Sequence, residues 1–367
     1  MKVLYFTNIP SPYRVDFFSE LALKCDLSVI YERNSASNRN KNWKTNGNGM
    51  YKEKCIDSLK LAKDKSLSFS IINEVKKQKY DVIVIGGYAT PTSMILISYL
   101  SMKKIPFILN ADGGFPNKKE AELVKKIKKC FISKASMYLS TGKITDEYLI
   151  EYGAKKNIIR NYNFTSLKEN DIGENLECKK LRKELNLEGK KIILSVGRIC
   201  FNKGFDTLIK ASKYLVDNTI ILIVGGKASV ELENLIKEEE ITNVFFIDFK
   251  SKDKLKEYFS IADIFVLPTR QDVWGLVINE AMANGLPVIT TNKCIAGLEL
   301  IENNINGFLF DVDNYKELAN RINELLNNED LIKTIKKNNL LKIRNYTIEN
   351  MANQHLKIFK EFKDKFN

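Results

Sequence analysis

The sequence predicts an α/β protein made of two doubly wound domains that face each other across a cleft. Two sets of short, β-branched apolar runs alternate with longer helical patterns, and a polar, charged stretch separates the two sets. This alternation is typical of parallel sheets covered by helices. A chain of 367 residues is also longer than one hydrophobic core usually organises.

Each set supplies six candidate strands. The expected strands of the first set are 2–7, 27–31, 82–85, 107–110, 137–140 and 157–160. Those of the second set are 191–196, 219–224, 244–247, 264–268, 287–290 and 307–310. We therefore expect an N-terminal domain over 1–165, a linker over 166–189 and a C-terminal domain over 190–346. Apolar residues at helical spacing in 347–367 predict a closing helix that returns toward the N-terminal domain.

The charge of the chain is unevenly distributed. The chain has 58 Lys and Arg against 45 Asp and Glu, a net charge of +13. Residues 1–160 hold 28 basic and 15 acidic side chains, so the excess lies in the N-terminal half. This asymmetry favours an anionic partner there, such as nucleic acid, an anionic membrane or a phosphorylated acceptor. A lysine-rich composition without a partner is the alternative.

Several classes of protein are disfavoured. The six cysteines include no Cys-x-x-Cys pair, which indicates free thiols in a reducing cytoplasm rather than disulfides or a zinc site. The N-terminus lacks the long apolar core of a signal peptide. The most apolar stretch, 82–100, is interrupted by Gly86-Gly87 and Pro91, which predicts a strand, a loop and a helix rather than a membrane span. Without an aromatic-interleaved basic motif, nucleic acid is not an expected partner.

The first candidate site follows the strand expected at 191–196. Gly197 allows a turn there, and Arg198 and Lys203 come next, before a helix that begins near Phe205. Two cations at the carboxyl end of a strand can hold a diphosphate and stabilise the negative charge that develops on it as a leaving group. The alternative is a pair of surface cations beside an ordinary turn.

The second candidate site is the segment DVWGLVINEAMANGLP, residues 272–287. A loop precedes an apolar helix over 275–284, whose free amides and positive dipole can hold the anionic part of a ligand. Asp272 in the loop and Glu280 in the helix can each accept hydrogen bonds from hydroxyl groups. An acid inside an apolar helix is costly to bury without a partner, which favours a site role for Glu280 over a surface position.

Asp272, seven further residues, Glu280 and then AMANGLPV resemble the hallmark of the family-4 retaining glycosyltransferases, which have the GT-B fold of two Rossmann-like domains. That family usually has Glu in place of Asp272, so the first acid here is one methylene shorter and its reach to a donor-sugar hydroxyl changes. The resemblance implies that Arg198 and Lys203 hold the diphosphate of a nucleotide-sugar donor. Glu280 would hold the ribose, and Asp272 with nearby amides the sugar and phosphate. The implied donor site comprises Gly197, Arg198, Lys203, Trp274, Gly275, Leu276, Val277 and Glu280.

The resemblance also implies that the N-terminal domain recognises the acceptor. Asn8, Tyr13 and Arg14 lie in the first loop after a strand, where that loop would approach the diphosphate and the acceptor. Asp112 stands where members of the family often carry His. His355, the single histidine, is expected to be a half-buried helical residue. The expected catalytic residues are Asp112, Arg198, Lys203, Asp272 and Glu280.

One histidine also constrains the mechanism. A Ser-His-Asp or Cys-His nucleophile is not expected. The resemblance implies instead that the departing phosphate deprotonates the attacking hydroxyl on the same face of the sugar, with positioning and charge stabilisation supplying most of the rate. We expect no metal ion and no other cofactor.

The segment 118–134 predicts an amphipathic helix. Leu123, Ile127 and Phe131 line one stripe. Six lysines flank it, namely Lys118, Lys119, Lys125, Lys126, Lys128 and Lys129. Either the stripe faces the core and the lysines are solvated, or the helix rests on anionic lipid and brings the site to a lipid-linked acceptor.

The predicted function is therefore a retaining, metal-independent glycosyltransferase that transfers a hexose-type sugar. The donor would be a nucleotide-diphosphate sugar, with UDP favoured and GDP as the alternative. The acceptor would be a growing glycan or a lipid-linked saccharide in cell-surface polysaccharide synthesis, such as capsule or lipopolysaccharide. The expected location is the cytoplasm, peripheral at the inner face of the membrane. A sugar-nucleotide epimerase and a non-catalytic, glycosyltransferase-like partner subunit are the alternatives.

Overall fold

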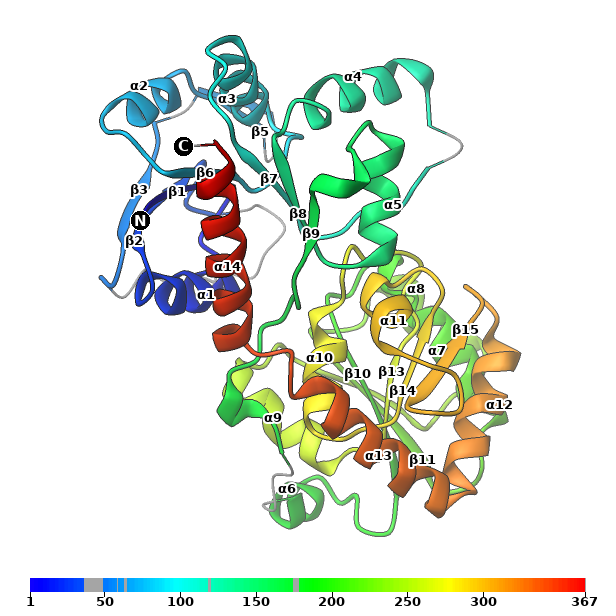
Figure 1. The fold of residues 1–367 in the computed structure, drawn as a ribbon. Coiled ribbons are helices and arrows are strands. Elements are labelled where there is room, and N and C mark those ends of the chain that lie inside the picture. The colour runs from blue at the N-terminus through cyan, green and yellow to red at the C-terminus, as the bar shows by residue number, and fades with distance from the viewer. Residues whose placement is uncertain (36–48, 58, 63–64, 118–119, 174–177, 367) are drawn as a thin grey trace. The chain divides into compact units, whose positions relative to one another are not determined.

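The structure is a computed structural model that describes residues 1–35, 49–57, 59–62, 65–117, 120–173 and 178–366. It divides into two compact units. Unit 1 comprises Met1–Ser166 and Thr347–Asn367, and unit 2 comprises Leu167–Tyr346. Each unit is a parallel sheet covered by helices (Figure 1), which confirms the predicted α/β class with two Rossmann-like domains.

Unit 1 is built on a parallel sheet of seven strands in the order β3-β2-β1-β6-β7-β8-β9. Its strands are β1 (Lys2–Thr7), β2 (Asp26–Tyr31), β3 (Lys52–Cys55), β6 (Val82–Ile85), β7 (Ile108–Ala111), β8 (Met137–Ser140) and β9 (Ile159–Asn161). A hairpin of β4 (Leu59–Ala62) and β5 (Lys65–Leu67) is separate from this sheet. The sequence does not predict β3, because KEKC is polar and lies at the exposed edge of the sheet.

The helices of unit 1 cover both faces of this sheet. They are α1 (Pro12–Ala22), α2 (Ser70–Lys76), α3 (Pro91–Met102), α4 (Glu122–Ile132), α5 (Lys143–Glu151) and α14 (Ile348–Phe366). On one face, Tyr5 of β1 packs on Phe18 of α1 with ring centroids 4.9 Å apart. Helix α14 lies along α1 on that side (Figure 1). On the other face, Leu4 and Phe6 join a core with Leu96 of α3.

Unit 2 is built on a parallel sheet of six strands in the order β12-β11-β10-β13-β14-β15. Its strands are β10 (Lys191–Val196), β11 (Thr219–Val224), β12 (Val244–Ile247), β13 (Ile264–Leu267), β14 (Val288–Thr291) and β15 (Gly307–Phe310). Its helices are α6 (Cys178–Glu184), α7 (Phe205–Ala211), α8 (Val230–Glu238), α9 (Lys252–Ile261), α10 (Leu276–Ala283), α11 (Ile295–Leu300), α12 (Tyr315–Leu326) and α13 (Glu329–Ile343). The central strands β10 and β13 are buried, as expected of β-branched runs in a parallel sheet.

Some boundaries differ from the expected ones. The expected strand 157–160 is a 3-10 turn (Lys156–Ile158) followed by β9, so only its second half is extended. From Leu167 onward, the stretch expected as a linker is part of unit 2. Arg182 of α6 donates from Nη2 to the carbonyl oxygen of Ile261 at 2.6 Å and pairs with Asp263 at 3.1 Å. These contacts hold the stretch against α9.

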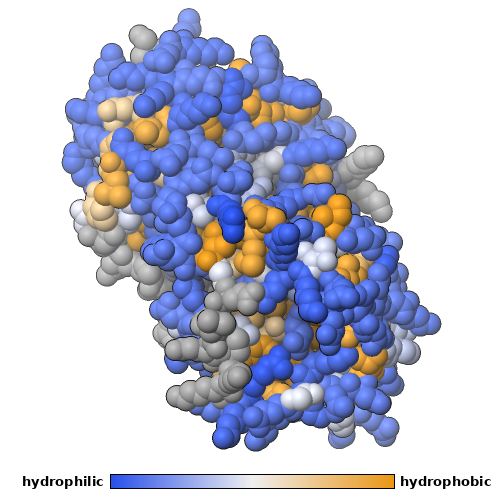
Figure 2. Space-filling model, turned by 60° about the horizontal axis from the view of Figure 1, so that its bottom comes forward, coloured by the Kyte–Doolittle hydropathy of each residue, from blue (hydrophilic) through white to orange (hydrophobic). Residues whose placement is uncertain are grey.

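The face of the protein shown in Figure 2 is largely polar. In the view of Figure 2, hydrophilic side chains cover most of the face, and hydrophobic groups lie between them in separate clusters. No helix within the described ranges combines the length and the apolar character needed to cross a bilayer.

Candidate functional site

Two loops of unit 2 meet at the carboxyl ends of the neighbouring strands β10 and β13. The first loop follows β10 and contains a 3-10 turn (Phe201–Lys203). The second follows β13. The Thr269 hydroxyl of the second loop donates to the carbonyl oxygen of Asn202 at 2.7 Å, and the Arg270 amide donates to the same oxygen at 2.8 Å. These two hydrogen bonds join the loops into one structure.

Lys203 and Asp272 form an ion pair between these loops. Their side chains are 16% and 20% exposed, so both charges are largely withdrawn from water. The stem of Lys203 passes so close to Gly197 that a Cβ there would lie 3.3 Å from its Cε. Two of the predicted donor-site residues, 69 positions apart, are thus brought together. An ammonium group has three N–H donors, so the Lys203 ammonium can contact Asp272 and a phosphate oxygen together.

Arg270 also joins the two loops, by donating from its guanidinium to the carbonyl oxygen of Phe201 at 2.8 Å, and its role was not predicted. Its guanidinium donates to both carboxylate oxygens of Asp206, at 3.0 and 2.6 Å, and pairs with Asp313 at 2.8 Å. It also lies 4.1 Å from the ring centroid of Phe201. The hydrogen bond to Asp206 raises the pKa of Arg270. The signal in the sequence was a cation directly after a strand and an acid in the first turn of α7.

Gly275 directly precedes helix α10, in a conformation that disfavours any side chain. Its φ is +96°, and an added Cβ would lie 2.7 Å from the Sγ of Cys294. Cys294 is fully buried and donates to the carbonyl oxygen of Trp274 at 3.1 Å, and burial raises its pKa to about 12. The backbone before α10 is therefore held close to α11. Leu276 and Val277, expected to offer free amides, are the first two residues of this helix.

Trp274 and Glu280 differ in their surroundings. Trp274 is 3% exposed, and its indole N–H donates to Asn279 at 2.9 Å, so it contributes to the packing beneath α10. Glu280 is half-buried on the second turn of α10 and lines a cavity of about 20 Å³ together with Asn284 and Lys256. Arg198 is exposed after β10.

A second polar cluster lies in unit 1, at the carboxyl ends of β1 and β7. Arg14 is 4% exposed and forms an ion pair with Asp112. Asp112 accepts further hydrogen bonds from Asn110 at 2.7 Å and from the Tyr162 hydroxyl at 3.1 Å. Although burial acts in the opposite direction, the Asp112 carboxylate raises the pKa of Arg14. The side chain of Asp112 is 31% exposed, so a hydrogen-bond acceptor remains accessible at the surface.

The remaining predicted residues of unit 1 surround this pair. The ring centroid of Tyr13 lies 5.7 Å from the Arg14 guanidinium carbon. Asn8 is exposed, and its side-chain oxygen accepts from the Ile9 amide at 2.8 Å, which shapes the loop after β1. His355, expected to be half-buried, is instead fully buried, because α14 packs its apolar face against α1.

The expectation of no metal assumed that no Asp-x-Asp pair stands at a strand end. This is wrong, because Asp311 and Asp313 form such a pair directly after β15. Both carboxylates are engaged by protein groups: Asp311 accepts from Asn292 at 2.6 Å, and Asp313 pairs with Arg270. Among the described residues, no group of three or more His, Cys, Asp or Glu side chains is placed to hold a metal ion.

Helix α4 leaves most of its apolar stripe exposed. Leu123, Val124 and Ile127 are 70%, 43% and 42% exposed, and Ile132 is the one fully buried residue of the helix. Of the two alternatives, a core-facing stripe therefore does not hold for Leu123 and Ile127, whereas Phe131 packs partly against the core. The inward side of the helix is instead taken up by ion pairs: Lys125 pairs with Glu151 at 3.0 Å, and Lys128 pairs with Glu120. Lys118 and Lys119 lie outside the described residues.

Lys126 and Lys129, the remaining two of the six flanking lysines, are exposed and form no ion pair with a described residue. On the helix surface they flank the exposed stripe. The amphipathic pattern predicted from the sequence is therefore present, but it faces solvent.

Comparison with known proteins connects unit 2 to one family. Residues 178–342 match the family of glycosyl transferases group 1. The match covers most of unit 2, including the Lys203–Asp272 pair and all of α10.

Individual glycosyltransferases are also similar to this chain. An uncharacterized glycosyltransferase of Haemophilus influenzae is 27% identical over 342 residues, which cover 78% of this chain and 93% of that protein. The capsular polysaccharide biosynthesis glycosyltransferase CapM of Staphylococcus aureus is 34% identical over 163 residues, covering 42% of this chain and 41% of that protein. The chain spans less than half the length of several curated relatives it matches.

Among solved structures, Anabaena HepE in complex with UDP is similar over 98% of this chain and all of that chain. The TM-score is 0.80 at 17% identity, so this likeness concerns the fold.

Proposed function

We propose that the protein is a glycosyltransferase that transfers a sugar from a nucleotide-diphosphate donor to a glycan or lipid-linked acceptor in surface polysaccharide synthesis. The group 1 match of residues 178–342 and the likeness to CapM support this reaction class. The Anabaena neighbour was solved with UDP, which supports a UDP-sugar over a GDP-sugar. The transferred sugar is proposed to be of the hexose type.

The Lys203–Asp272 pair is the observation that carries this proposal. A half-buried ammonium next to the first residues of α10 offers a charged donor and free amides to one anionic group. Asp272 limits the cost of keeping Lys203 charged while no donor is bound. Its other oxygen can accept a hydrogen bond from a sugar hydroxyl. Arg198, exposed after β10, would neutralise the second phosphate, and Glu280 would accept from the ribose.

The proposed reaction retains the anomeric configuration. The bond between the anomeric carbon and the diphosphate oxygen breaks as the acceptor oxygen forms its bond on the same face. The proton of the acceptor hydroxyl passes to the departing diphosphate. Lys203 and Arg198 then stabilise the charge that grows on the leaving group, which is where electrostatic stabilisation lowers a barrier most.

Donor hydrolysis by the purified protein tests this function. A UDP-sugar should be hydrolysed slowly without acceptor, and faster than the matching GDP-sugar. Lys203→Ala should lower kcat/KM at least 100-fold, about 3 kcal/mol of transition-state stabilisation. Asp272→Asn should lower it about tenfold or more, because the ammonium loses its anionic partner. Glu280→Ala should mainly raise KM. NMR of a transferred sugar should show the donor's anomeric configuration.

Lys213→Ala is the matched control, because Lys213 forms an exposed ion pair with Glu239 elsewhere in unit 2. It should leave kcat/KM within twofold of the parent. Conversion of the donor to an isomer without hydrolysis would identify an epimerase instead. Binding without any turnover, unaffected by Lys203→Ala, would indicate a non-catalytic subunit.

We further propose that the protein works at the cytoplasmic face of a membrane, to which unit 1 binds peripherally. The net positive charge of residues 1–160 and the exposed apolar stripe of α4 support this location. An amphipathic helix flanked by lysines binds anionic lipid through both its apolar area and its charge. Such binding would bring the acceptor-side cluster of Arg14 and Asp112 to a lipid-linked saccharide.

A further inference from the structure

An open apolar groove lies beside α4 in unit 1. It has a volume of about 430 Å³ and is lined by side chains of α2, α3 and α4, among them Ile72, Met94, Ile95, Tyr99, Met102 and Phe131. Apart from Ser98, the lining is apolar or aromatic. Helix α3, which supplies most of it, contains no charged residue (PTSMILISYLSM). Its volume lies in the range of ligand pockets, about 300–1,000 Å³.

The groove continues onto the exposed apolar surface of unit 1. Met102, at its α3 end, is 71% exposed. Phe131, which lines the groove, is on the same helix as the exposed Leu123 and Ile127. An apolar surface of this kind, joined to a groove, marks an interaction site rather than a solvated face.

Lysines surround the groove. The Lys76 ammonium lies 5.6 Å from the ring centroid of Tyr99, and the Lys134 ammonium lies 5.5 Å from that of Phe131. Both rings belong to the groove lining, so these two contacts place positive charge at its rim. Lys103 and Lys104 directly follow Met102 and are exposed. In the described part of the chain, no ion pair neutralises any of these four lysines.

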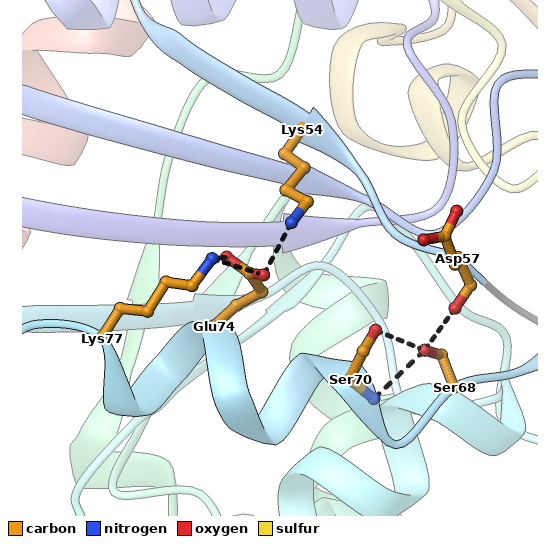
Figure 3. A network of polar contacts seen from close by, with 6 residues as sticks. All are labelled: Lys54, Asp57, Ser68, Ser70, Glu74 and Lys77. Atoms are coloured by element: carbon orange, nitrogen blue, oxygen red, sulfur yellow. Dashed lines mark hydrogen bonds and ion pairs between the residues drawn. The ribbon is translucent and has the colours of Figure 1, made fainter.

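Helix α2, which contributes the Ile72 side of the groove, is anchored at both ends (Figure 3). At its start, the Ser70 amide donates to the Ser68 hydroxyl oxygen at 3.3 Å, and the two hydroxyls lie 2.8 Å apart. Near its end, Glu74 accepts from Lys54 of β3 at 2.8 Å and from Lys77 at 2.9 Å. These contacts fix helix α2, so its side of the groove does not depend on a ligand.

We propose that this groove holds an acyl chain of an anionic bilayer phospholipid, with its headgroup phosphate on the lysines at the rim. The inference rests on the proposed membrane location and specifies how unit 1 binds there. An open apolar groove suits a hydrocarbon chain, and the lysines at its rim suit the phosphate attached to that chain. A second copy of this chain is a poorer occupant, because it would bring a like net charge of +13 against the lysine rim.

A tryptophan placed at the groove tests this assignment. The probes are vesicles of phosphatidylcholine with phosphatidylglycerol brominated along its acyl chains, since bromine quenches indole fluorescence only on contact. Met102→Trp should lose at least half of its added fluorescence on binding, after subtraction of the parent signal. Leu23→Trp is the matched control: Leu23 is 63% exposed in the same unit but distant in sequence from the groove. It should be quenched by less than a tenth.

A second variant fills the groove without changing its charge. Ser98→Trp should weaken binding to phosphatidylglycerol vesicles at least fivefold, while slow donor hydrolysis stays within twofold of the parent. Vesicle binding that is unchanged in Ser98→Trp, or a Met102→Trp signal unaffected by bromine, would overturn the groove while leaving surface binding intact. Absence of donor hydrolysis in the parent would instead reject the proposed transfer reaction.

Two further outcomes identify other occupants. Binding that requires polyprenyl phosphate in the vesicles, with no response to phosphatidylglycerol, would overturn the assignment in favour of a lipid carrier. A lipid-free dimer in sedimentation velocity that Ser98→Trp dissociates would assign the groove to a second copy of the chain.

Discussion

His355 lies buried between the rings of Phe17 and Tyr162, with centroid distances of 4.7 and 4.5 Å. Its Nδ1 is 2.8 Å from the carbonyl oxygen of Met351, and its Nε2 has no hydrogen-bond partner among the described residues. Burial lowers its pKa to about 4, and the nearby Arg14 cation adds to this effect. The imidazole is therefore neutral in the folded protein at neutral pH.

We predict that this histidine makes unfolding pH-dependent. Its folded pKa is about 4 against an ordinary value of 6.5, so the unfolded chain takes up the proton first as the pH falls. The stabilisation is complete above pH 6.5 and is lost as the pH falls toward 4. Between pH 7 and pH 5 the free energy of unfolding should drop by about 2 kcal/mol from this group. Urea denaturation of the parent and of His355→Gln measures it.

His355→Gln keeps a polar group near Met351 but does not titrate. The difference between the parent and variant free energies of unfolding should therefore shrink by about 2 kcal/mol on going from pH 7 to pH 5. Parallel curves for the two proteins would show that His355 does not titrate below its ordinary range.

At the scale of single elements, the start of α10 depends on Gly275. Its positive φ and its closeness to Cys294 are two separate reasons for glycine. We predict that Gly275→Ala lowers the free energy of unfolding by about 3 kcal/mol, from left-handed backbone strain of about 1–2 kcal/mol plus overpacking of about 1–3 kcal/mol. It should also weaken donor binding, because the first amides of α10 would move.

Gly189→Ala separates the two causes. Gly189 has a similar φ of +70° in the same unit, but an added Cβ there meets nothing within 4 Å. This variant should show the backbone strain alone, about 1–2 kcal/mol. Adding Cys294→Ala to Gly275→Ala should recover part of the loss. Equal losses for the two glycine variants in urea denaturation would indicate that contact with Cys294 plays no role.

The elements also show what a sequence can disclose. Strands β10 and β13 are uniform apolar runs, and their prediction needs only local information. Strand β3 is polar, and its pairing with β2 defines it, so no local pattern indicated it. The Asn8, Arg14 and Asp112 loops follow parallel strands, whose carboxyl ends meet at one edge, but their proximity was not predicted.

Pairings inside the site were harder to predict. The roles of Lys203 and Asp272 were inferred separately, but their mutual ion pair depends on loop paths that the sequence does not specify. Arg270 was missed for the same reason, since its partners Asp206 and Asp313 are 64 and 43 positions away along the chain. The sequence left the facing of α4 open between the core and a lipid surface, because the inward side of the helix carries ion pairs instead of apolar contacts.

At the scale of the molecule, the basic excess of residues 1–160 should govern membrane affinity. We predict that Lys126→Ala with Lys129→Ala weakens binding to anionic vesicles about 30-fold, from about 1 kcal/mol for each lysine near the surface. The effect should fade at high salt, where exposed charges are screened. Vesicle sedimentation at two salt concentrations measures it.

Lys357→Ala with Lys360→Ala is the control for this pair. Both lysines are exposed on α14 of the same unit, so the net charge changes equally. Their removal should weaken binding less than threefold. If both double variants weaken binding alike, net charge and not the position of α4 determines the affinity.

Unit 1 is assembled from two segments of chain, because α14 comes from Thr347–Asn367 while the rest precedes Leu167. During translation, roughly 180 residues of unit 2 must therefore emerge before unit 1 can close, which takes about 10–40 s at ordinary elongation rates. Throughout that interval Phe17 and its neighbours on α1 are not covered by α14. A nascent chain stalled before α14 would carry a finished unit 2 and an open, aggregation-prone unit 1, and thus a natural binding site for a chaperone.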